Sequence, residues 1–211
     1  MTLTEELLQV NTANREKIPA EILSVLDAAS AELVEKNLIV GVIKQGDVFP
    51  EFTLTNSVGE NVSLFSVADN KSLVICFYRG GWCPYCNIQL NALQKAIPQF
   101  TEKGAKLVAI TPETPDNSLS TKEKNALEFE VLSDIDNKLA KELGMVFQLP
   151  KSVQDIYNQF GISIEKHNGN ADYELPLTAT FVVDKDKKII YRYVNEDYTK
   201  RAEITDILGA L

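Results

Sequence analysis

The sequence has few residues that could hold a metal ion. It contains one histidine, His167, and three cysteines among 211 residues. A structural zinc site needs about four ligands, usually a second Cys-x-x-Cys pair or two histidines. Cys76 lies inside an apolar run and His167 lies in the polar loop EKHNGNAD, so neither completes such a set. We therefore expect no metal, and nothing in the sequence calls for an organic cofactor.

The sequence also shows no basic stripe, no pattern typical of a signal peptide and no long apolar run. Its 30 acidic residues outnumber its 21 basic ones, and the net charge is -9, which argues against a nucleic-acid partner. The first residues, MTLTEELLQVNTANREK, have no basic start and no long apolar core, unlike a signal peptide. No window approaches the roughly 18 apolar residues of a membrane span. These absences predict a cytoplasmic protein with no membrane partner.

Apolar residues make up 45% of the chain. This fraction and the chain length fit one domain with an extension. Residues 1–45 are predicted to form an N-terminal helical extension, and residues 46–211 the domain. Apolar residues recur at helix spacing over Ala20–Lys36, and a shorter helix is expected over Glu5–Val10. The apolar face of these helices is too large to leave in water, so it should pack on the domain or on a second copy of the chain in a homodimer.

The start of the domain predicts a parallel strand-helix-strand unit. Ser72–Tyr78 is an almost unbroken apolar run, typical of a strand that is buried on both faces. A helix is expected over about Pro84–Lys103, with a kink at Pro98. Lys106–Ile110 then predicts a second buried strand, parallel to the first.

The rest of the chain continues this alternation. Further helices are expected near residues 117–126, 136–143 and 152–160, two strands at 180–184 and 188–194 should form a hairpin, and a last helix should follow from residue 204. The predicted fold class is therefore α/β, with a central mixed sheet and helices on both faces.

The segment FYRGGWCPYCN carries the chemistry. Cys83 and Cys86 are three residues apart at the predicted start of a helix, where they share a face and can form a disulfide. Unpaired backbone N–H groups and the helix dipole favour a thiolate there. A structural disulfide over so short a loop would stabilise little. Such a pair beside a strand-helix-strand unit is typical of a thioredoxin-like redox site, whereas Cys76 is expected to be a buried apolar residue.

The same residues resemble a known family. FYRGGWCPYCN, followed by LVAITPETPDNS, FEVLSD, LTATFVVD and NEDYTKR, is similar to the peroxiredoxin-like branch of the alkyl hydroperoxide reductase / thiol-specific antioxidant (AhpC/TSA) family, which has a thioredoxin fold. The resemblance implies a thiol-dependent peroxidase that reduces hydroperoxides. The reacting cysteine would become a sulfenic acid and then a Cys83–Cys86 disulfide, which thioredoxin or a low-molecular-weight thiol would reduce.

The sequence departs from the peroxiredoxin pattern at several positions. The proline, threonine and attacking cysteine of peroxiredoxins fall at Arg79, Cys83 and Cys86, so only the cysteine is kept. Where peroxiredoxins place an arginine and thioredoxins a cis-proline, on the strand that faces the cysteine, this chain has Thr178. The assisting arginine would then have to be Arg79 or Arg201.

Two points about the site stay open in the sequence. Cys83, at the helix end, should be the more exposed thiol with the lower pKa, so we expect it to be the attacking thiolate and Cys86 the resolving thiol, whereas the peroxiredoxin register favours Cys86. Trp82 either packs beside the pair or shapes a docking surface for a partner thiol protein. Gly80 and Gly81 most simply allow a sharp turn from strand to helix.

Two other functions compete with peroxide reduction. One is a thioredoxin-like protein-disulfide reductase without peroxidase activity. The other is a binding or chaperone module that has kept the fold and uses oxidation only as a switch. Peroxide consumption separates the first function from these two, and reduction of insulin disulfides separates these two from each other.

Overall fold

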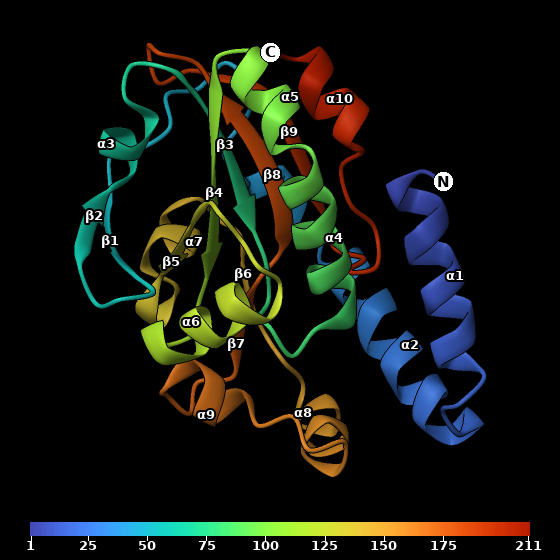
Figure 1. Cartoon of the computed structure of the whole chain (residues 1–211). Coiled ribbons are helices and arrows are strands. Elements are labelled where there is room, and N and C mark those ends of the chain that lie inside the picture. The colour runs from blue at the N-terminus through green and yellow to red at the C-terminus, as the bar shows by residue number, and fades with distance from the viewer.

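The computed structural model describes all residues, 1–211, and is built around a seven-stranded sheet (Figure 1). Its strands are β1 (Thr53–Asn56), β2 (Asn61–Ser63), β3 (Ser72–Phe77), β4 (Ala105–Thr111), β5 (Glu130–Ser133), β8 (Thr178–Val183) and β9 (Ile189–Asn195). They lie in the order β2-β1-β5-β4-β3-β8-β9. Strands β3, β4 and β5 are parallel, and the remaining pairs are antiparallel. The predicted mixed sheet is confirmed.

Helices and a small second sheet surround this centre. The α-helices are α1 (Leu3–Arg15), α2 (Ala20–Glu35), α3 (Leu64–Ala68), α4 (Pro84–Lys95), α5 (Ile97–Glu102), α6 (Pro115–Lys124), α7 (Lys138–Glu142), α8 (Lys151–Gln159), α9 (Ile164–Asn168) and α10 (Ile204–Gly209). Two 3-10 helices are η1 (Leu38–Gly41) and η2 (Ile135–Asn137). Strands β6 (Val146–Gln148) and β7 (Glu174–Pro176) pair with each other.

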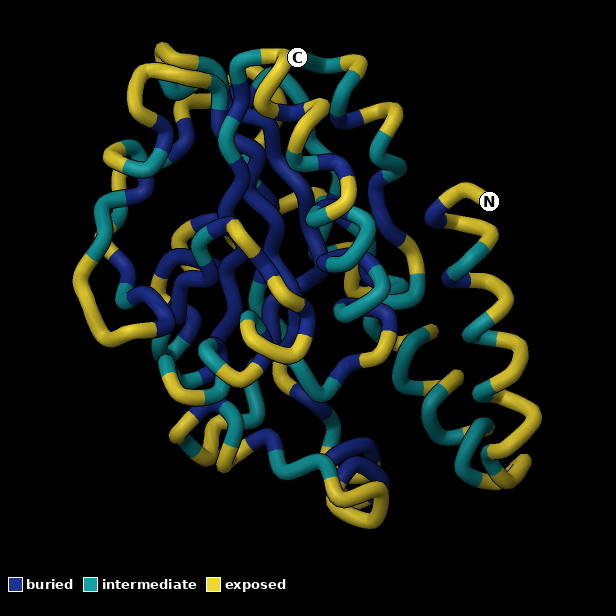
Figure 2. The backbone as a smooth tube through the Cα atoms, viewed as in Figure 1, coloured by how far each residue is buried: buried dark blue, intermediate teal, exposed yellow.

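The sheet is buried on both faces, as the apolar run of β3 predicted. Successive side chains of a strand point to opposite faces. Val74 and Cys76 therefore join the core beneath α4 and α5, whereas Ile75 and Phe77 join the core on the opposite face, with α3 and α7. Figure 2 shows the central strands buried and the exposed residues gathered on the outer helices and loops. Cys76 is fully buried, which confirms its expected place in the core.

The predicted strand-helix-strand unit is present as β3, α4 and β4. Ser72 pairs with Ala105 in the parallel ladder. The expected kink near Pro98 is a complete break: α4 ends, Ala96 takes φ -90 and ψ -3, and α5 begins with Pro98 in its first turn. Proline has no backbone N–H to donate into the preceding turn, so the helix restarts there.

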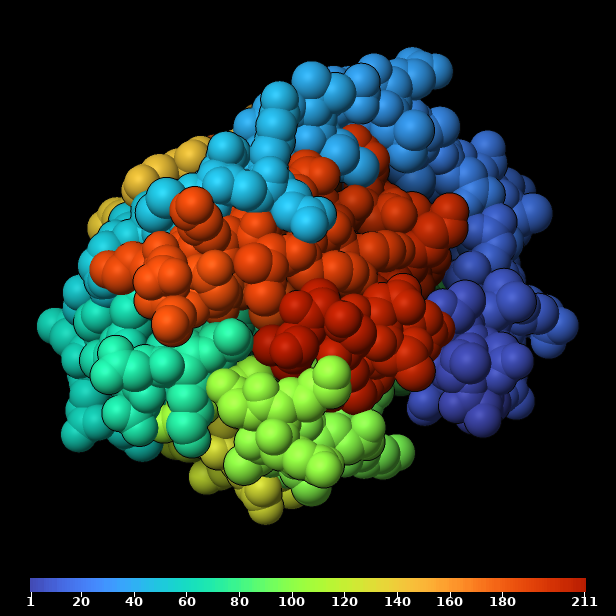
Figure 3. Space-filling view, turned by 90° about the horizontal axis from the view of Figure 1, so that it is seen from above, coloured from blue at the N-terminus to red at the C-terminus, as the bar shows by residue number.

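The N-terminal helix α1 is fixed at its first turn. The Thr2 hydroxyl accepts from the Glu5 backbone N–H, and the Glu5 carboxylate accepts from the Thr2 N–H, which satisfies two free donors. Glu203, near the other end of the chain, accepts from the N–H groups of Leu3 and Thr4. Figure 3 shows the C-terminal segment beside this helix. Leu3 is buried against the main core, so α1 is held by both polar and apolar contacts.

Helix α2 packs on the same chain. Leu26 and Ala29 of α2 lie against a small core that α8 builds from Val153, Ile156 and Tyr157. The predicted N-terminal helices are therefore present, and their apolar faces are partly covered within one chain, whereas Leu8 and Val34 remain exposed. No helix combines the length and the apolar character that a bilayer span requires. The division of the chain at residue 45 stays a prediction.

Candidate active site

The cysteine pair lies at the turn between β3 and α4, as the sequence predicted. Cys83 is the N-cap of α4 with an extended backbone, Pro84 is its first residue, and Cys86 is its third. Both thiols are reduced in this structure. Asn87 holds the turn by donating to the backbone oxygens of Gly81, at 2.8 Å, and Cys83, at 3.0 Å.

The expectation that Cys83 is the more exposed thiol is wrong. Cys83 is 1% exposed and Cys86 is 0% exposed. The first turn of an isolated helix is exposed to solvent. Here Leu7 of α1 belongs to the same buried cluster as both thiols, and Tyr198 packs against that cluster. The extension and the loop after β9 therefore cover the pair, and exposure does not distinguish the two sulfurs.

A guanidinium contacts one sulfur directly. Arg201 Nη2 donates to Cys86 Sγ across 3.4 Å, and Arg201 Nη1 donates to the Lys200 backbone oxygen at 2.8 Å. The side chain is buried, so its charge is poorly screened. Arg201, which the sequence could not place, thus lies at the cysteine pair.

The surroundings of the pair favour the anion on Cys86. Burial opposes ionisation of Cys86, but the adjacent Cys83 thiol and the positive charge of Arg201 outweigh burial, so the pKa of Cys86 is lowered below its ordinary value. Burial raises the pKa of Cys83, and the adjacent Cys86 raises it further. The expected order, with the lower pKa on Cys83, is therefore reversed, because the adjacent Cys83 thiol and the two arginines favour the anion on Cys86.

Arg79 is the second arginine at the site. Its guanidinium is buried among aromatic rings, with Cζ 4.8 Å from the centre of the Trp82 ring and 4.2 Å from that of Tyr198. Its Nη2 donates to the Tyr157 hydroxyl at 2.5 Å. The positive charge of Arg79 also contributes to the lowered pKa of Cys86. Arg79 thus occupies the register position of the family's proline and adds positive charge beside the sulfur.

A buried carboxylate holds the same turn from the other side. Glu113, which follows β4, is fully buried, and its Oε2 accepts from the Gly81 N–H at 2.8 Å. Its Oε1 lies 2.7 Å from His167 Nδ1. In the sequence, the signal for Glu113 is its place at the carboxyl end of a predicted parallel strand, where such sheets carry their sites.

Two glycines are required by close packing in this turn. Gly80 has φ +152, and a Cβ there would lie 2.2 Å from Trp82 Nε1. A Cβ on Gly81 would lie 2.0 Å from the Thr121 hydroxyl. The two glycines therefore let the side chains of Trp82 and Thr121 pack against the backbone. They also allow the sharp turn that the sequence predicted.

The other predicted site residues have different positions. Trp82 is tilted against Tyr157, with ring centres 5.5 Å apart, and lies 6.5 Å from the His167 ring. It therefore packs beside the pair. Thr178 is buried at the start of β8, its hydroxyl has no hydrogen-bond partner, and the chain has no cis peptide bond. Thr178 thus bonds to neither cysteine.

Comparison with known proteins agrees with this arrangement. The sequence profile described as "AhpC/TSA family" matches residues 45–192. The chain belongs to the AhpC/TSA family. It is 29% identical over 176 residues to the chloroplastic peroxiredoxin Q of Populus jackii, covering 83% of this chain and 71% of that protein. It is 30% identical over 170 residues to a putative chloroplastic peroxiredoxin Q of Oryza sativa subsp. indica, covering 80% and 68%.

Solved structures of other proteins have the same fold as this AhpC/TSA chain. The peroxidoxin BcpB of Mycobacterium tuberculosis is similar with a TM-score of 0.63 at 19% identity, covering 80% of this chain and 96% of that one. A mutant PrxQ of Xylella fastidiosa has a TM-score of 0.61 at 16% identity, covering 79% and 94%. The predicted thioredoxin-like fold is confirmed, as is the predicted class of thiol-dependent peroxidase in this family. The roles of the individual cysteines stay predictions.

Proposed function

We propose that this AhpC/TSA protein reduces hydroperoxides with Cys86 as the attacking thiolate and Cys83 as the resolving thiol. The contact between Arg201 and Cys86 Sγ, at 3.4 Å, carries the proposal, because the thiolate is the nucleophile in such reactions. The guanidinium selects which of two equally buried sulfurs is ionised. The family register, which places the attacking cysteine at Cys86, agrees.

The reaction proceeds in two steps within the pair. The Cys86 thiolate attacks the outer oxygen of the hydroperoxide, the O–O bond breaks, and the alkoxide leaves as an alcohol after it takes up a proton. Cys86 becomes a sulfenic acid. The Cys83 sulfur, having lost its proton, then attacks the Cys86 sulfur. Water leaves, and the Cys83–Cys86 disulfide forms.

A dithiol outside the chain closes the cycle by two-electron reduction of that disulfide. We propose thioredoxin or a low-molecular-weight thiol for this step, and a cytoplasmic location. Because some relatives are named chloroplastic, the cytoplasmic location stays a prediction. The homodimer also stays a prediction. The pair at the first turn of α4 also suits a protein-disulfide reductase, so this second function needs its own assay.

The deciding experiment compares two single variants. Hydroperoxide consumption is followed through NADPH oxidation with thioredoxin and thioredoxin reductase, and sulfenic acid is trapped with dimedone. Cys83→Ser should still form a trappable sulfenic acid on Cys86, whereas Cys86→Ser should lose it. The opposite pattern would reject Cys86 as the attacking thiol. Insulin reduction without any peroxide consumption would favour the reductase instead.

A further inference from the structure

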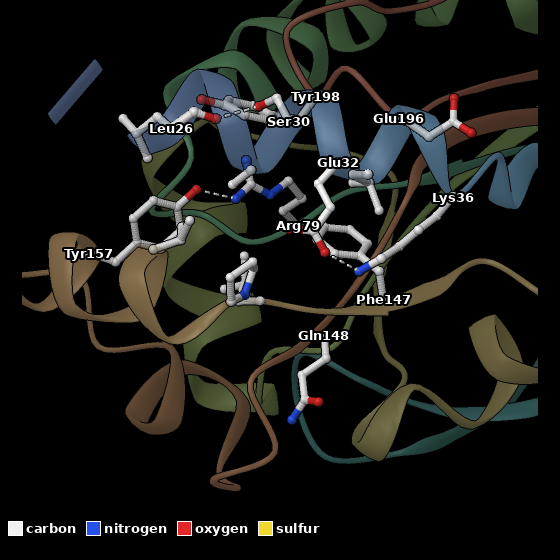
Figure 4. A pocket seen from close by; sticks show the side chains of 15 residues that line it. Leu26, Ser30, Glu32, Lys36, Arg79, Phe147, Gln148, Tyr157, Glu196 and Tyr198 are labelled. Atoms are coloured by element: carbon white, nitrogen blue, oxygen red, sulfur yellow. Dashed lines mark hydrogen bonds and ion pairs between the residues drawn. The ribbon is translucent and has the colours of Figure 1, made fainter. Parts of the chain in front are cut away.

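A small cavity lies between α2 of the extension and the α8 and β6 segments, and we call it the Arg79 pocket (Figure 4). Its volume is about 40 Å³, which is room for roughly three water molecules. Nearly half of the residues that line it are polar or charged, and neither cysteine is among them. The cavity therefore suits a small polar ligand that does not itself react at the cysteine pair.

The buried Arg79 guanidinium is surrounded by aromatic rings but has few hydrogen-bond acceptors. Its Cζ lies 4.2 Å from the centre of the Tyr198 ring and 4.8 Å from that of the Trp82 ring. Only Nη2 is hydrogen-bonded, to the Tyr157 hydroxyl, whereas Nε and Nη1 have no partner within the protein. A buried charged donor without a partner is costly. The two remaining donor atoms therefore call for acceptor atoms from a ligand.

The charge of Arg79 also has no counterion within the protein. Arg79 forms no ion pair. The acids of the lining bond elsewhere, since Glu32 pairs with Lys36 at 2.8 Å and Glu196 accepts from the Ile39 backbone N–H at 3.3 Å. Figure 4 shows the Glu196 carboxylate pointing away from Arg79. A neutral ligand would satisfy the donors and leave the charge uncompensated, whereas a small anion would do both.

The ionisation of Cys86 depends on the groups around it, and Arg79 is one of them. Burial raises the pKa of Cys86, whereas the Cys83 thiol and the charges of Arg201 and Arg79 lower it. The other titratable groups near Cys86 stay neutral, because burial raises the pKa of each; they are Cys76 and Tyr78. An anion beside Arg79 would cancel part of the positive charge, so the pKa of Cys86 would rise and less thiolate would be present.

We infer that the Arg79 pocket binds a small monoanion of the carboxylate type, which neutralises Arg79 and thereby slows the reactions of Cys86. The binding site stands on the geometry of the pocket, and its effect on the reaction rests on the proposed function. The anion forms no covalent bond and acts through its charge alone. One wall of the pocket is α2, which lies outside the residues 45–192 that the family profile matches. The site is thus a feature that the extension adds to the domain.

Formate is the probe, because it is a carboxylate with about as many non-hydrogen atoms as the cavity has room for water molecules. Trp82 is the only tryptophan, and its ring lies 4.8 Å from Arg79 Cζ, so its fluorescence reports on the pocket. Sodium formate replaces sodium gluconate at constant ionic strength, and gluconate is too large for the cavity. The emission should change in a saturable way, with half-saturation at about 1–30 mM, because so small a ligand binds no tighter than roughly 1 mM. A linear change, or none, would overturn the anion site.

A pair of variants places the anion in the pocket. Ala29 lines the cavity, whereas Ala28 is exposed on the same helix. Ala29→Leu adds about as many atoms as formate has, so it should raise the half-saturating formate concentration at least tenfold, and Ala28→Leu should leave it unchanged. If Ala29→Leu does not fold by circular dichroism, Ala29→Val replaces it, with Ala28→Val as control. Because Arg201 does not line the pocket, equal titrations in both variants would place the anion elsewhere and overturn the assignment.

The effect on Cys86 is measured separately from binding. Alkylation of Cys86 by iodoacetamide is followed by mass spectrometry from about pH 4.5 to 8, with saturating formate or with gluconate. Formate should move the midpoint of this profile to higher pH by about half a unit or more in the wild type and in Ala28→Leu. The midpoint should stay in place in Ala29→Leu. Binding without any movement of the wild-type midpoint would overturn the regulatory claim.

The outcomes separate the anion site from the proposed function. If the titration and the midpoint behave as expected but no hydroperoxide is consumed, the anion site stands and the proposed function fails. If hydroperoxide is consumed but formate gives no saturable change, the anion site is overturned and the proposed function stands.

Discussion

Arg201 and Cys86 are 115 positions apart in the sequence, and the guanidinium Nη2 lies 3.4 Å from the sulfur. Burial raises the pKa of Cys86, whereas the adjacent Cys83 thiol and the charge of Arg201, carried by the loop after β9, lower it below its ordinary value. The chemistry of the CPYC segment therefore depends on a residue from the far end of the chain.

Replacing that arginine should change the pH profile of Cys86. Only the thiolate reacts with iodoacetamide, so alkylation slows as the pH falls through the pKa and is constant above it. The wild-type rate at Cys86, followed by mass spectrometry, should already be flat between pH 7 and 9. Arg201→Met should raise the pKa by about one to three units, so that its rate still climbs there. Lys200→Met, an exposed neighbour, is the control and should follow the wild-type profile.

The oxidised protein should contain one disulfide, Cys83–Cys86, with Cys76 free. Cys76 lies within β3, and burial raises its pKa to about 12, so it stays a thiol. Peptide mapping after one equivalent of hydroperoxide, without reductant, checks this. Cys76→Ala should give the same disulfide, and a main product that links Cys76 to either partner would refute the assignment.

Glu113→Gln should destabilise the fold by about 1.5–3 kcal/mol, the usual contribution of a hydrogen bond to a charged group. The substitution removes the negative charge that faces the Gly81 N–H and His167. Urea unfolding gives the free energy. Glu123→Gln, on the exposed face of α6, makes the same chemical change away from this network, and an equal loss in both variants would mean that the buried contact contributes nothing.

The docking of α1 can be measured with two adjacent leucines. Leu7 is 3% exposed and Leu8 is 63% exposed. Leu7→Ala should cost about 2–5 kcal/mol, the range for a buried leucine. Leu8→Ala should stay within about 0.5 kcal/mol. The same unfolding experiment serves both. Indistinguishable midpoints would show that α1 does not rest on the core.

The sequence predicted the elements with strong periodicity. The apolar run of β3, the helix over α4 and α5 and the β8–β9 hairpin all lie close to their expected bounds. Seven strands and α-helices were not predicted, namely β1, β2, α3, β5, β6, β7 and α9, and neither was the 3-10 helix η1. Each has three to five residues, too few for a helical or alternating pattern to be distinguished from a loop.

The cysteine pair was predictable because its spacing and its place at a helix start are local features. Which of the two thiols has the lower pKa was not predictable from the sequence. It depends on Arg201, on the cover provided by Leu7 and on Glu113 across the turn, which are contacts between distant segments. A thiol's pKa follows its three-dimensional charge environment, and the expected exposure of Cys83 considered the helix alone.

The hydrogen bonds from the first turn of α1 to Glu203 join two segments that are 200 positions apart in the sequence. Arg201, which contacts Cys86 Sγ, precedes Glu203 by only two residues. A displacement of α1 would therefore loosen the same short segment that holds the guanidinium against the sulfur. The cover over the cysteine pair and the charge beside it are mechanically linked.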